Sequence, residues 1–248
     1  MMNVAIVTGA GTGIGAATAS RLAGLGWCVT LVGRRREMLE RVAAGFDGTS
    51  GKALVLAEDL ADPKSARRIV EHTLQKFGRV DALINNAATI KVMPVEDFTL
   101  EVIDLHWAIN IRAPFLLIQA ALPALRESMG AVVNISSSSG TLLRPGQSIY
   151  GMSKAALEYL TRSLAGELAG SKVRINALAL GPVDTPIHET WATDLTAAYQ
   201  WLASQVPLQR IARPEEIARW IELLIAPDSA WMTGACIPLD GGQTLDIA

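Results

Sequence analysis

The chain has little cysteine and little net charge. Cys28 and Cys236 are its only cysteines among 248 residues, and no side chains at metal-ligand spacing accompany either. Two cysteines cannot form a disulfide framework, so we expect a reducing compartment, the cytoplasm, and no bound metal. The 22 basic and 24 acidic residues give a formal net charge of −2, which excludes a broad basic surface for nucleic acid or an anionic membrane.

Long hydrophobic runs are also scarce. The first apolar run covers only Val4–Val7 and follows no charged leader, so we expect no secretory signal. The longest apolar stretch, Phe115–Leu125, is interrupted by Gln119 and Pro123 and falls short of the roughly 20 residues of a membrane span. We therefore expect no membrane partner. With 50% hydrophobic and 19% charged residues, the composition is that of a globular protein with a sizeable core.

Short apolar runs alternate along the chain with longer segments of helical period. The predicted strands are Val4–Thr8, Cys28–Val32, Ala53–Ala57, Ala82–Asn85, Ala131–Ser136, Val173–Leu178 and Cys236–Leu239. The predicted helices are Ile14–Leu25, Glu37–Ala44, Pro63–Phe77, a stretch within Leu100–Glu127, Ile149–Leu168 and Pro214–Ile225. Apolar runs without polar alternation are typical of strands covered on both faces. We predict an α/β fold, a doubly wound parallel sheet of about seven strands with helices on both faces.

No linker or change of composition divides the chain, so we predict one domain over residues 1–248. The segment 186–206 carries Trp191, Tyr199 and Trp201 but fits no strand of the sheet. Two interpretations remain open for it: a lid over a substrate, or an extra helical pair at the edge of the core.

A glycine-rich loop, Thr8–Gly15, joins the first predicted strand directly to the first predicted helix. Without Cβ atoms the backbone can turn tightly and approach a pyrophosphate, which is then held by the free N–H groups and the positive end of the helix dipole. A flexible turn would have the same composition, but the strand-loop-helix setting favours a nucleotide cofactor.

Tyr150 and Lys154 lie four positions apart in a predicted helix, so both project from one helical face. A lysine cation beside the phenol would favour the phenolate and lower the tyrosine pKa from about 10. Such a phenol can pass a proton to or from a substrate oxygen. Taken alone, this pair is as readily a coincidence of spacing.

Several motifs in register remove that ambiguity. They are Gly9-x-x-x-Gly13-x-Gly15 after the first strand, Asn85–Ala88 after the fourth, Ser137 thirteen positions before Tyr150, and Tyr150-x-x-x-Lys154. In this order, and over essentially the whole chain, they resemble the short-chain dehydrogenase/reductase family. The resemblance implies an alcohol dehydrogenase or carbonyl reductase that transfers a hydride between a nicotinamide and a carbonyl or secondary alcohol.

The resemblance also implies four catalytic residues. Tyr150 would be the general acid in reduction and the general base in oxidation, and Lys154 would lower its pKa and hold the nicotinamide ribose. The family spacing selects Ser137 from its serine run to hydrogen-bond the substrate oxygen, while the neighbouring serines satisfy backbone groups. Asn110 would bind a water that links the lysine to solvent, although an asparagine within a helix could instead make a local backbone bond at a bend.

Further positions match the cofactor contacts of the family. Asp59 and Leu60 would contact the adenine, Val183 would meet the nicotinamide carboxamide, and Thr185 would hold it. Leu180 departs from the family, in which a proline usually precedes this glycine. The full predicted set of cofactor-binding residues is Gly9, Thr12, Gly13, Ile14, Gly15, Arg34, Asp59, Leu60, Asn86, Ala87, Tyr150, Lys154, Gly181, Val183 and Thr185.

The end of the second predicted strand bears on the choice of nicotinamide. Gly33 stands where an NAD enzyme places an acid for the ribose 2′-hydroxyl, and the guanidinium of Arg34 could bind the 2′-phosphate of NADP. Thr12 argues the other way, because that position is often basic in NADP-preferring relatives. A solvated arginine cluster would leave the choice open. We favour NADP(H), with NAD(H) as the alternative.

The sequence says less about the substrate than about the cofactor. The residues expected around it are largely apolar with a few polar anchors, which suits a small or medium carbonyl compound; they are Thr89, Ile90, Lys91, Leu142, Leu143, Gln147, His188 and Trp191. A 3-oxoacyl thioester is an alternative, disfavoured because Gly166 stands where acyl-carrier-protein reductases commonly carry arginine. A catalytically silent nicotinamide-binding regulator or scaffold is a second alternative, disfavoured because the four catalytic residues are intact.

Assembly is likewise inferred from the resemblance. Relatives pair two long helices across a dyad and often form tetramers, so we expect a homotetramer or homodimer. Apolar residues on the corresponding helices permit such packing, although the core accounts for some of them; they are Phe115, Leu116, Leu157, Leu160 and Leu164.

Overall fold

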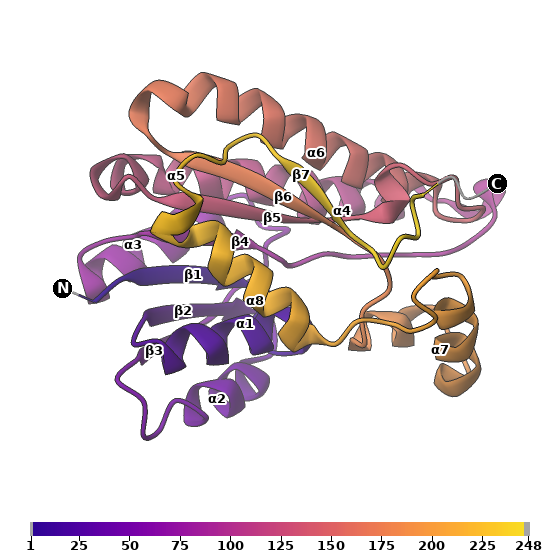
Figure 1. Cartoon of the computed structure of the whole chain (residues 1–248), viewed down its shortest axis with the longest axis horizontal. Coiled ribbons are helices and arrows are strands. Elements are labelled where there is room, and N and C mark those ends of the chain that lie inside the picture. The colour runs from indigo at the N-terminus through magenta and orange to yellow at the C-terminus, as the bar shows by residue number, and fades with distance from the viewer. Residues whose placement is uncertain (1, 246–248) are drawn as a thin grey trace.

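Seven parallel strands form the centre of the structure, a computed structural model that describes residues 2–245 (Figure 1). The strands are β1 (Val4–Thr8), β2 (Cys28–Gly33), β3 (Lys52–Ala57), β4 (Ala82–Asn85), β5 (Ala131–Ser137), β6 (Arg174–Leu180) and β7 (Cys236–Leu239). They lie in the order β3-β2-β1-β4-β5-β6-β7, and neighbouring strands pair in parallel throughout. The carboxyl ends of all seven strands therefore share one edge of the sheet.

Two layers of helices cover the sheet (Figure 1). One core packs against α1 (Gly13–Gly24), α2 (Arg36–Ala44) and α8 (Pro214–Ile225). The opposite core packs against α3 (Ser65–Phe77), α5 (Ala113–Ser128) and α6 (Ser148–Leu168). Consecutive residues of β1, Ile6 and Val7, are both fully buried and belong to opposite cores. Burial on both faces explains why the strand sequences are continuously apolar.

Other short elements complete the chain. Ahead of α5 come α4 (Leu100–Trp107) and a π-helical turn, Ala108–Arg112. Short 3₁₀ helices span Val95–Asp97, Ser138–Gly140, Ala169–Ser171, Pro186–Thr190 and Pro227–Ser229. The remaining α-helix, α7 (Leu195–Ser204), lies beyond the carboxyl ends of the strands, apart from the two covering layers (Figure 1). The segment 186–206 thus stands next to the edge where ligands bind in open α/β sheets.

The fold predicted from the sequence is confirmed: all seven strands occur, and their limits differ by at most two residues. The largest differences are that β6 continues to Leu180 and that a π-helical turn interrupts the long predicted helix. Leu180 is 5% exposed and packs in the core, so the residue that departs from the family motif ends a regular strand.

The helical run Leu100–Ser128 corrects the expectation that no apolar stretch approaches the length of a membrane span. It is 29 residues long and contains an 18-residue window of mean hydropathy 1.4, so by length and composition it could cross a membrane. Half of that window is buried within the fold. Leu117, Ala121 and Leu125 of α5 pack against the sheet, so this stretch is a core helix.

Candidate active site

A cavity of about 880 Å³ runs along the edge of the sheet where the strands end. Residues from the loops after β1 to β6 line it. Ser137 and all the predicted cofactor-binding residues except Gly15 are among them. Asn110, Lys91 and Leu142 do not line the cavity. Lys91 is exposed, and Leu142 is half-buried, with its N–H bonded to the Ser138 carbonyl at 2.8 Å.

The loop between β1 and α1 fits a pyrophosphate. Gly9 and Gly13 have φ angles of 66° and 52°, and a Cβ atom at either would lie 2.8 Å from a neighbouring side chain, Asn86 or Thr185. The Thr12 side chain makes no cap bond, so the first N–H groups of α1 are open to an anion. Gly15 has another role, because a Cβ there would overlap the Gly9 carbonyl; it packs the helix against the loop.

Thr8, which the sequence reading did not single out, holds two of these loops together. Its hydroxyl accepts hydrogen bonds from the N–H groups of Asn86 (2.9 Å) and Ala87 (3.0 Å), and donates to the Ile84 carbonyl (3.2 Å). The Asn86 amide donates in return to the Thr8 carbonyl at 2.8 Å. The loops after β1 and β4, which both line the cavity, are therefore fixed relative to each other.

Tyr150, Ser137 and Lys154 lie close together in the lining of the cavity. Tyr150 is 8% exposed and hydrogen-bonds to the Ser137 side chain. Lys154 lies one helical turn further along α6, with Nζ 5.5 Å from the centre of the Tyr150 ring. The ammonium donates to the Ile135 carbonyl of β5 at 2.8 Å. The phenol and the serine hydroxyl can both contact one substrate oxygen, with a cation behind them.

Burial dominates the protonation of this pair. It raises the pKa of Tyr150 to about 12, against the opposing effect of the Ser137 hydrogen bond. It lowers the pKa of Lys154 to about 8, against the opposing effect of the Glu158 carboxylate. The expected lowering of the Tyr150 pKa by Lys154 is therefore absent, because both groups are removed from water and the ammonium is turned to the Ile135 carbonyl. At neutral pH the phenol keeps its proton.

The serines beside Ser137 are occupied elsewhere. Their hydroxyls donate to side chains: Ser136 to Glu158 at 2.8 Å, Ser138 to Gln243 at 2.8 Å and Ser139 to Gln147 at 2.9 Å. The backbone partners predicted for them are fewer: within residues 2–245, only the Ser136 hydroxyl donates to one, the Lys154 carbonyl at 3.3 Å. Ser137 is the member of the run that hydrogen-bonds to Tyr150.

Asn110, for which the role of water ligand stays a prediction, bonds to two neighbouring segments through its side chain. Its side-chain oxygen accepts from Thr89 N–H (2.9 Å), and its amide nitrogen donates to the Thr89 carbonyl (3.0 Å) and the Ser153 hydroxyl (2.9 Å). His106, one turn earlier, accepts a bond from Lys91 N–H through Nε2 at 3.1 Å. The amide of Asn110 therefore joins its helix to the segment after β4 and to α6, beside Lys154.

Comparison with known proteins agrees with this geometry. A family model described as enoyl-(acyl carrier protein) reductase matches residues 9–244. The chain is 34% identical to a 3-oxoacyl-[acyl-carrier-protein] reductase of Thermotoga maritima, over 98% of each chain. A short-chain type dehydrogenase/reductase from Mycobacterium marinum superimposes with a TM-score of 0.91 at 33% identity, covering 98% of this chain and 96% of the other. The protein belongs to the short-chain dehydrogenase/reductase family. It is an oxidoreductase of the kind that transfers a hydride to or from a nicotinamide cofactor.

A related structure bears on the cofactor of this short-chain dehydrogenase/reductase. The 3-ketoacyl-(acyl-carrier-protein) reductase of Brucella melitensis, complexed with NADH, superimposes with a TM-score of 0.90 at 30% identity and covers 98% of both chains. In the present protein, Arg34 and Arg35 line the end of the cavity beside β2 and are exposed. Neither has an ion-pair partner within residues 2–245, whereas Arg36 pairs with Glu40 at 3.7 Å. Within the described residues, the cavity lining beside β2 therefore carries two guanidinium groups without an ion-pair partner.

Aromatic side chains from the segment 186–206 surround His188 at the other end of the cavity. His188 donates from Nε2 to the Val183 carbonyl at 2.9 Å, and Trp191 and Tyr199 meet its ring edge to face at 5.6 and 5.5 Å. Burial lowers its pKa. His188 is therefore a neutral wall residue, and Thr89, Ile90, Leu143, Gln147 and Trp191 of the predicted substrate region also line the cavity.

The sequence reading missed several residues of this cavity. Met38, Glu58, Arg144 and Gln243 all line it. Arg35 was visible in the arginine run. Arg144 carries a recognisable signal, the turn sequence Arg-Pro-Gly-Gln, whereas the return of the C-terminal segment with Gln243 to the site depends on tertiary packing alone.

Proposed function

We propose that the protein is a nicotinamide-dependent carbonyl reductase or alcohol dehydrogenase with Tyr150 as its acid-base group. The observation that carries the proposal is the convergence of Tyr150, Ser137 and Lys154 in a cavity that begins at the glycine loop. The bound nicotinamide supplies the hydride in reduction and accepts it in oxidation. In reduction, Tyr150 donates its proton to the substrate oxygen while Ser137 hydrogen-bonds that oxygen; in oxidation the proton returns to Tyr150.

The other predicted residues have supporting parts in this proposal. Lys154 holds the nicotinamide ribose and places positive charge behind the phenol, which offsets the negative charge that develops on Tyr150 in proton donation. Asn110 positions α6 through Ser153, and its predicted link to a water and to Lys154 stays part of the proposal. The cofactor-binding residues act as predicted, with Gly15 supporting the loop from behind.

NADP(H) is the proposed cofactor, with NAD(H) as the alternative. The end of β2 offers Gly33 and the unpaired Arg34 and Arg35. Glu58, the nearby acid at the end of β3, is held by the guanidinium of Arg68 at 3.1 and 2.6 Å. An acid that is already paired is a poor acceptor for a ribose 2′-hydroxyl, and two free cations favour a 2′-phosphate.

A 3-oxoacyl thioester reductase is the second candidate. The similarity to the Thermotoga maritima reductase favours it. Gly166 on α6 weighs against it, because a Cβ there would meet no atom within 4 Å, and the position offers no basic group to a carrier protein. A silent nicotinamide-binding regulator or scaffold is disfavoured by the geometry of Tyr150, Ser137 and Lys154.

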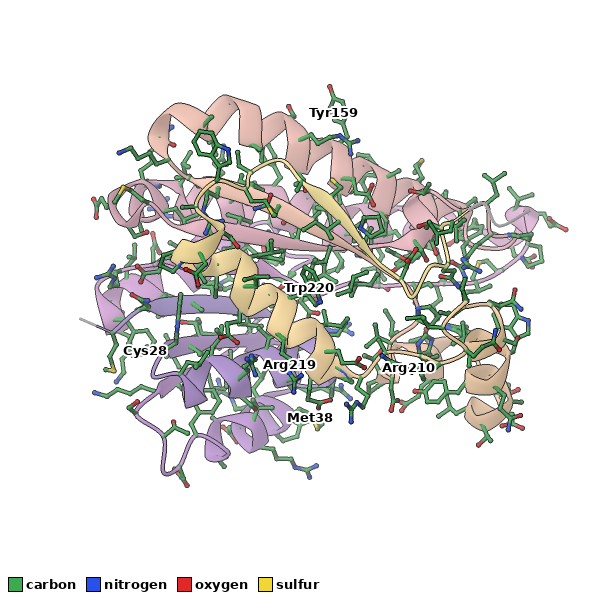
Figure 2. All side chains as sticks on the ribbon, in the orientation of Figure 1. Cys28, Met38, Tyr159, Arg210, Arg219 and Trp220 are labelled. Carbon is green, nitrogen blue, oxygen red and sulfur yellow. The ribbon has the colours of Figure 1, made fainter. Side chains whose placement is uncertain are left out.

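The single domain is proposed to carry the segment 186–206 as its substrate lid, since His188 and Trp191 line the cavity together with Trp201 and Leu202 of α7. A homotetramer or homodimer is proposed as the assembly. Leu157 does not contribute to it, because that side chain is 1% exposed in the core. Phe115 is 41% exposed, and Tyr159 points away from the body of the molecule (Figure 2). The cytoplasm is proposed as the compartment, since both cysteines are free.

Replacement of Tyr150 by phenylalanine tests the proposed chemistry. We expect the Tyr150→Phe variant to lose at least about 100-fold in kcat for carbonyl reduction, because it removes the general acid, while the Kd for NADPH changes little. Turnover is followed by NADPH absorbance and binding by cofactor fluorescence. Undiminished turnover would refute the role of Tyr150, and a wild-type protein that binds cofactor but turns over no carbonyl or alcohol would favour the silent regulator.

A further inference from the structure

The substrate end of the cavity contains a cation without a partner. Arg144, between β5 and α6, is half-buried and lines the cavity together with its neighbours Leu143 and Gln147. Its side chain makes no hydrogen bond or ion pair within residues 2–245. Arg144 has no part in the chemistry of Tyr150, so its presence in the cavity needs another explanation.

A rigid turn presents this arginine. Pro145 and Gly146 form the corner of a β-turn, in which Gln147 N–H donates to the Arg144 carbonyl at 3.1 Å and Gly146 has a φ of 77°. Proline followed by a glycine with positive φ is typical of a type II turn. The Gly146 carbonyl accepts from Met93 N–H at 3.0 Å, which fixes the turn to the segment after β4. The turn that begins at Arg144 is therefore held in place by one bond within it and one to a neighbouring segment.

A second half-buried arginine shows what is missing at Arg144. Burial lowers the pKa of both Arg144 and Arg174. The Arg174 guanidinium donates to the carbonyls of Leu224 at 2.8 Å and Ala226 at 3.2 Å, so its loss of hydration is compensated. A guanidinium that loses water without gaining acceptors is unfavourable, and a bound anion would supply the acceptors that Arg144 lacks.

The charges around the cavity point the same way. The acidic residues that line it are Glu58 and Asp59, both at the end of β3 on the adenosine side. Near Arg144 the described lining contains no carboxylate. Arg144 is therefore a cation in the lining with no carboxylate beside it to offset its charge, an arrangement that attracts an anionic group.

We propose that Arg144 binds an anionic group of the substrate, so that the protein acts on carbonyl compounds or alcohols that carry a carboxylate or sulfonate. The inference rests on the proposed function, because it assigns the substrate class of the same site. A planar guanidinium suits both groups, since it can bind two oxygens at once. The apolar wall around it accommodates the rest of the molecule, and Tyr150 addresses the carbonyl.

Binding of matched ketones tests the proposal without requiring turnover. The probes are 4-acetylbenzoate, 4-acetylbenzenesulfonate and the neutral 4-acetylbenzamide, titrated calorimetrically into the protein with NADP⁺, a pair that cannot react. We expect the wild type to bind at least one anionic ketone about 10- to 100-fold more tightly than the amide. In Arg144→Gln this preference falls to below about threefold, because the guanidinium is lost.

The control is Arg219→Gln, which removes the same charge from the exposed outer side of α8 (Figure 2), outside the cavity lining. It should keep the wild-type preference. Equal binding of the anionic and neutral ketones by the wild type, absence of binding of all three, or a preference that survives Arg144→Gln overturns the proposal. A preference for one anion over the other supports it and identifies the group.

Reduction of the same ketones with NADPH separates this inference from the proposed function. The expected result is a rise in KM for the anionic ketone in Arg144→Gln with kcat changed less, since the anion is bound equally before and during the reaction. Preferential binding without any turnover of ketones or of the corresponding alcohols supports the role of Arg144 and refutes the proposed oxidoreductase chemistry. Turnover without a preference for the anionic ketones supports the proposed oxidoreductase chemistry and refutes the role of Arg144.

Discussion

At the scale of single residues, the site depends on how far Tyr150 and Lys154 are removed from water. The spacing of the two in the sequence suggests a cation that lowers the pKa of a phenol, but their burial sets the opposite direction for the isolated protein. The phenol is thereby kept as a proton donor at neutral pH. The lysine has the larger consequence, because its charge is partly lost within the range in which enzymes are assayed.

The lowered pKa of Lys154 should make the free energy of unfolding depend on pH. Burial lowers the pKa of Lys154 from 10.5 to about 8, so between these values the unfolded chain binds this proton more readily than the folded one. Its contribution to the free energy of unfolding therefore rises with pH across that window, by up to about 1.4 kcal/mol per pH unit. Above pH 10 the raised pKa of Tyr150 lowers the free energy of unfolding as the pH rises, because the folded protein then binds the phenol proton more readily than the unfolded chain.

Urea unfolding of the cofactor-free protein at pH 8, 9 and 10 measures the effect. The wild type should gain stability relative to Lys154→Met as the pH rises, because methionine keeps the apolar stem and removes the titrating group. Parallel pH profiles for the two proteins would show that Lys154 titrates as an ordinary lysine.

At the scale of elements, the turn from β2 into α2 governs the proposed choice between NADP(H) and NAD(H). Its three consecutive arginines are chemically alike in the sequence, yet they differ in the structure. Arg34 and Arg35 face the cavity, whereas Arg36 is paired with Glu40 on α2. This difference supplies a matched pair of variants within one run of residues.

We expect Arg34→Ala to raise the KM for NADPH about 10- to 100-fold, since a charge-assisted hydrogen bond to the 2′-phosphate is lost. The KM for NADH should change by less than about threefold, as NADH lacks that phosphate. Arg36→Ala is the control and should leave both constants near the wild-type values. Steady-state kinetics with each cofactor decides the matter, and a wild type that works better with NADH than with NADPH would contradict the assignment.

The elements themselves could be predicted from the sequence, but the contacts between them could not. The strands that are buried on both faces and the glycine loop can be predicted from the local sequence, because each depends on a short run of residues. The partners of Asn110 could not be predicted, since they depend on the meeting of the π-helical turn, Thr89 and α6. The lack of a partner for the Arg144 side chain within residues 2–245 could not be predicted from the sequence either, because it depends on the tertiary packing of the side chains around it.

At the scale of the whole molecule, the surface of α5 and α6 is more apolar than an isolated protein requires. Phe115, Met152 and Tyr159 are 41%, 48% and 70% exposed, and Tyr159 projects outward from α6 (Figure 2). Met152 and Tyr159 are seven residues apart, so they lie on one face of the helix. At a different place, Trp231 is fully exposed. Two separate apolar regions are consistent with the proposed assembly.

Light scattering coupled to size-exclusion chromatography should give a mass of two or four times the 26.4 kDa chain. Glutamate at both Met152 and Tyr159 should lower that mass, because it places charge in an apolar contact. Leu25→Glu is the matched control, as Leu25 is 53% exposed at the end of α1. A wild-type mass near that of one chain would contradict the proposal.

The π-helical turn at Ala108–Arg112 has one more consequence, for the evolution of the chain's length. A π-helical turn contains one residue more than an α-helical turn, so deletion of that residue would leave a regular helix. Residues before and after the deletion would then be rotated relative to each other by about 100°. His106 and Asn110 could no longer both meet the segment that holds Lys91 and Thr89. Insertions and deletions should therefore be tolerated in the surface loops of relatives, but not in this turn.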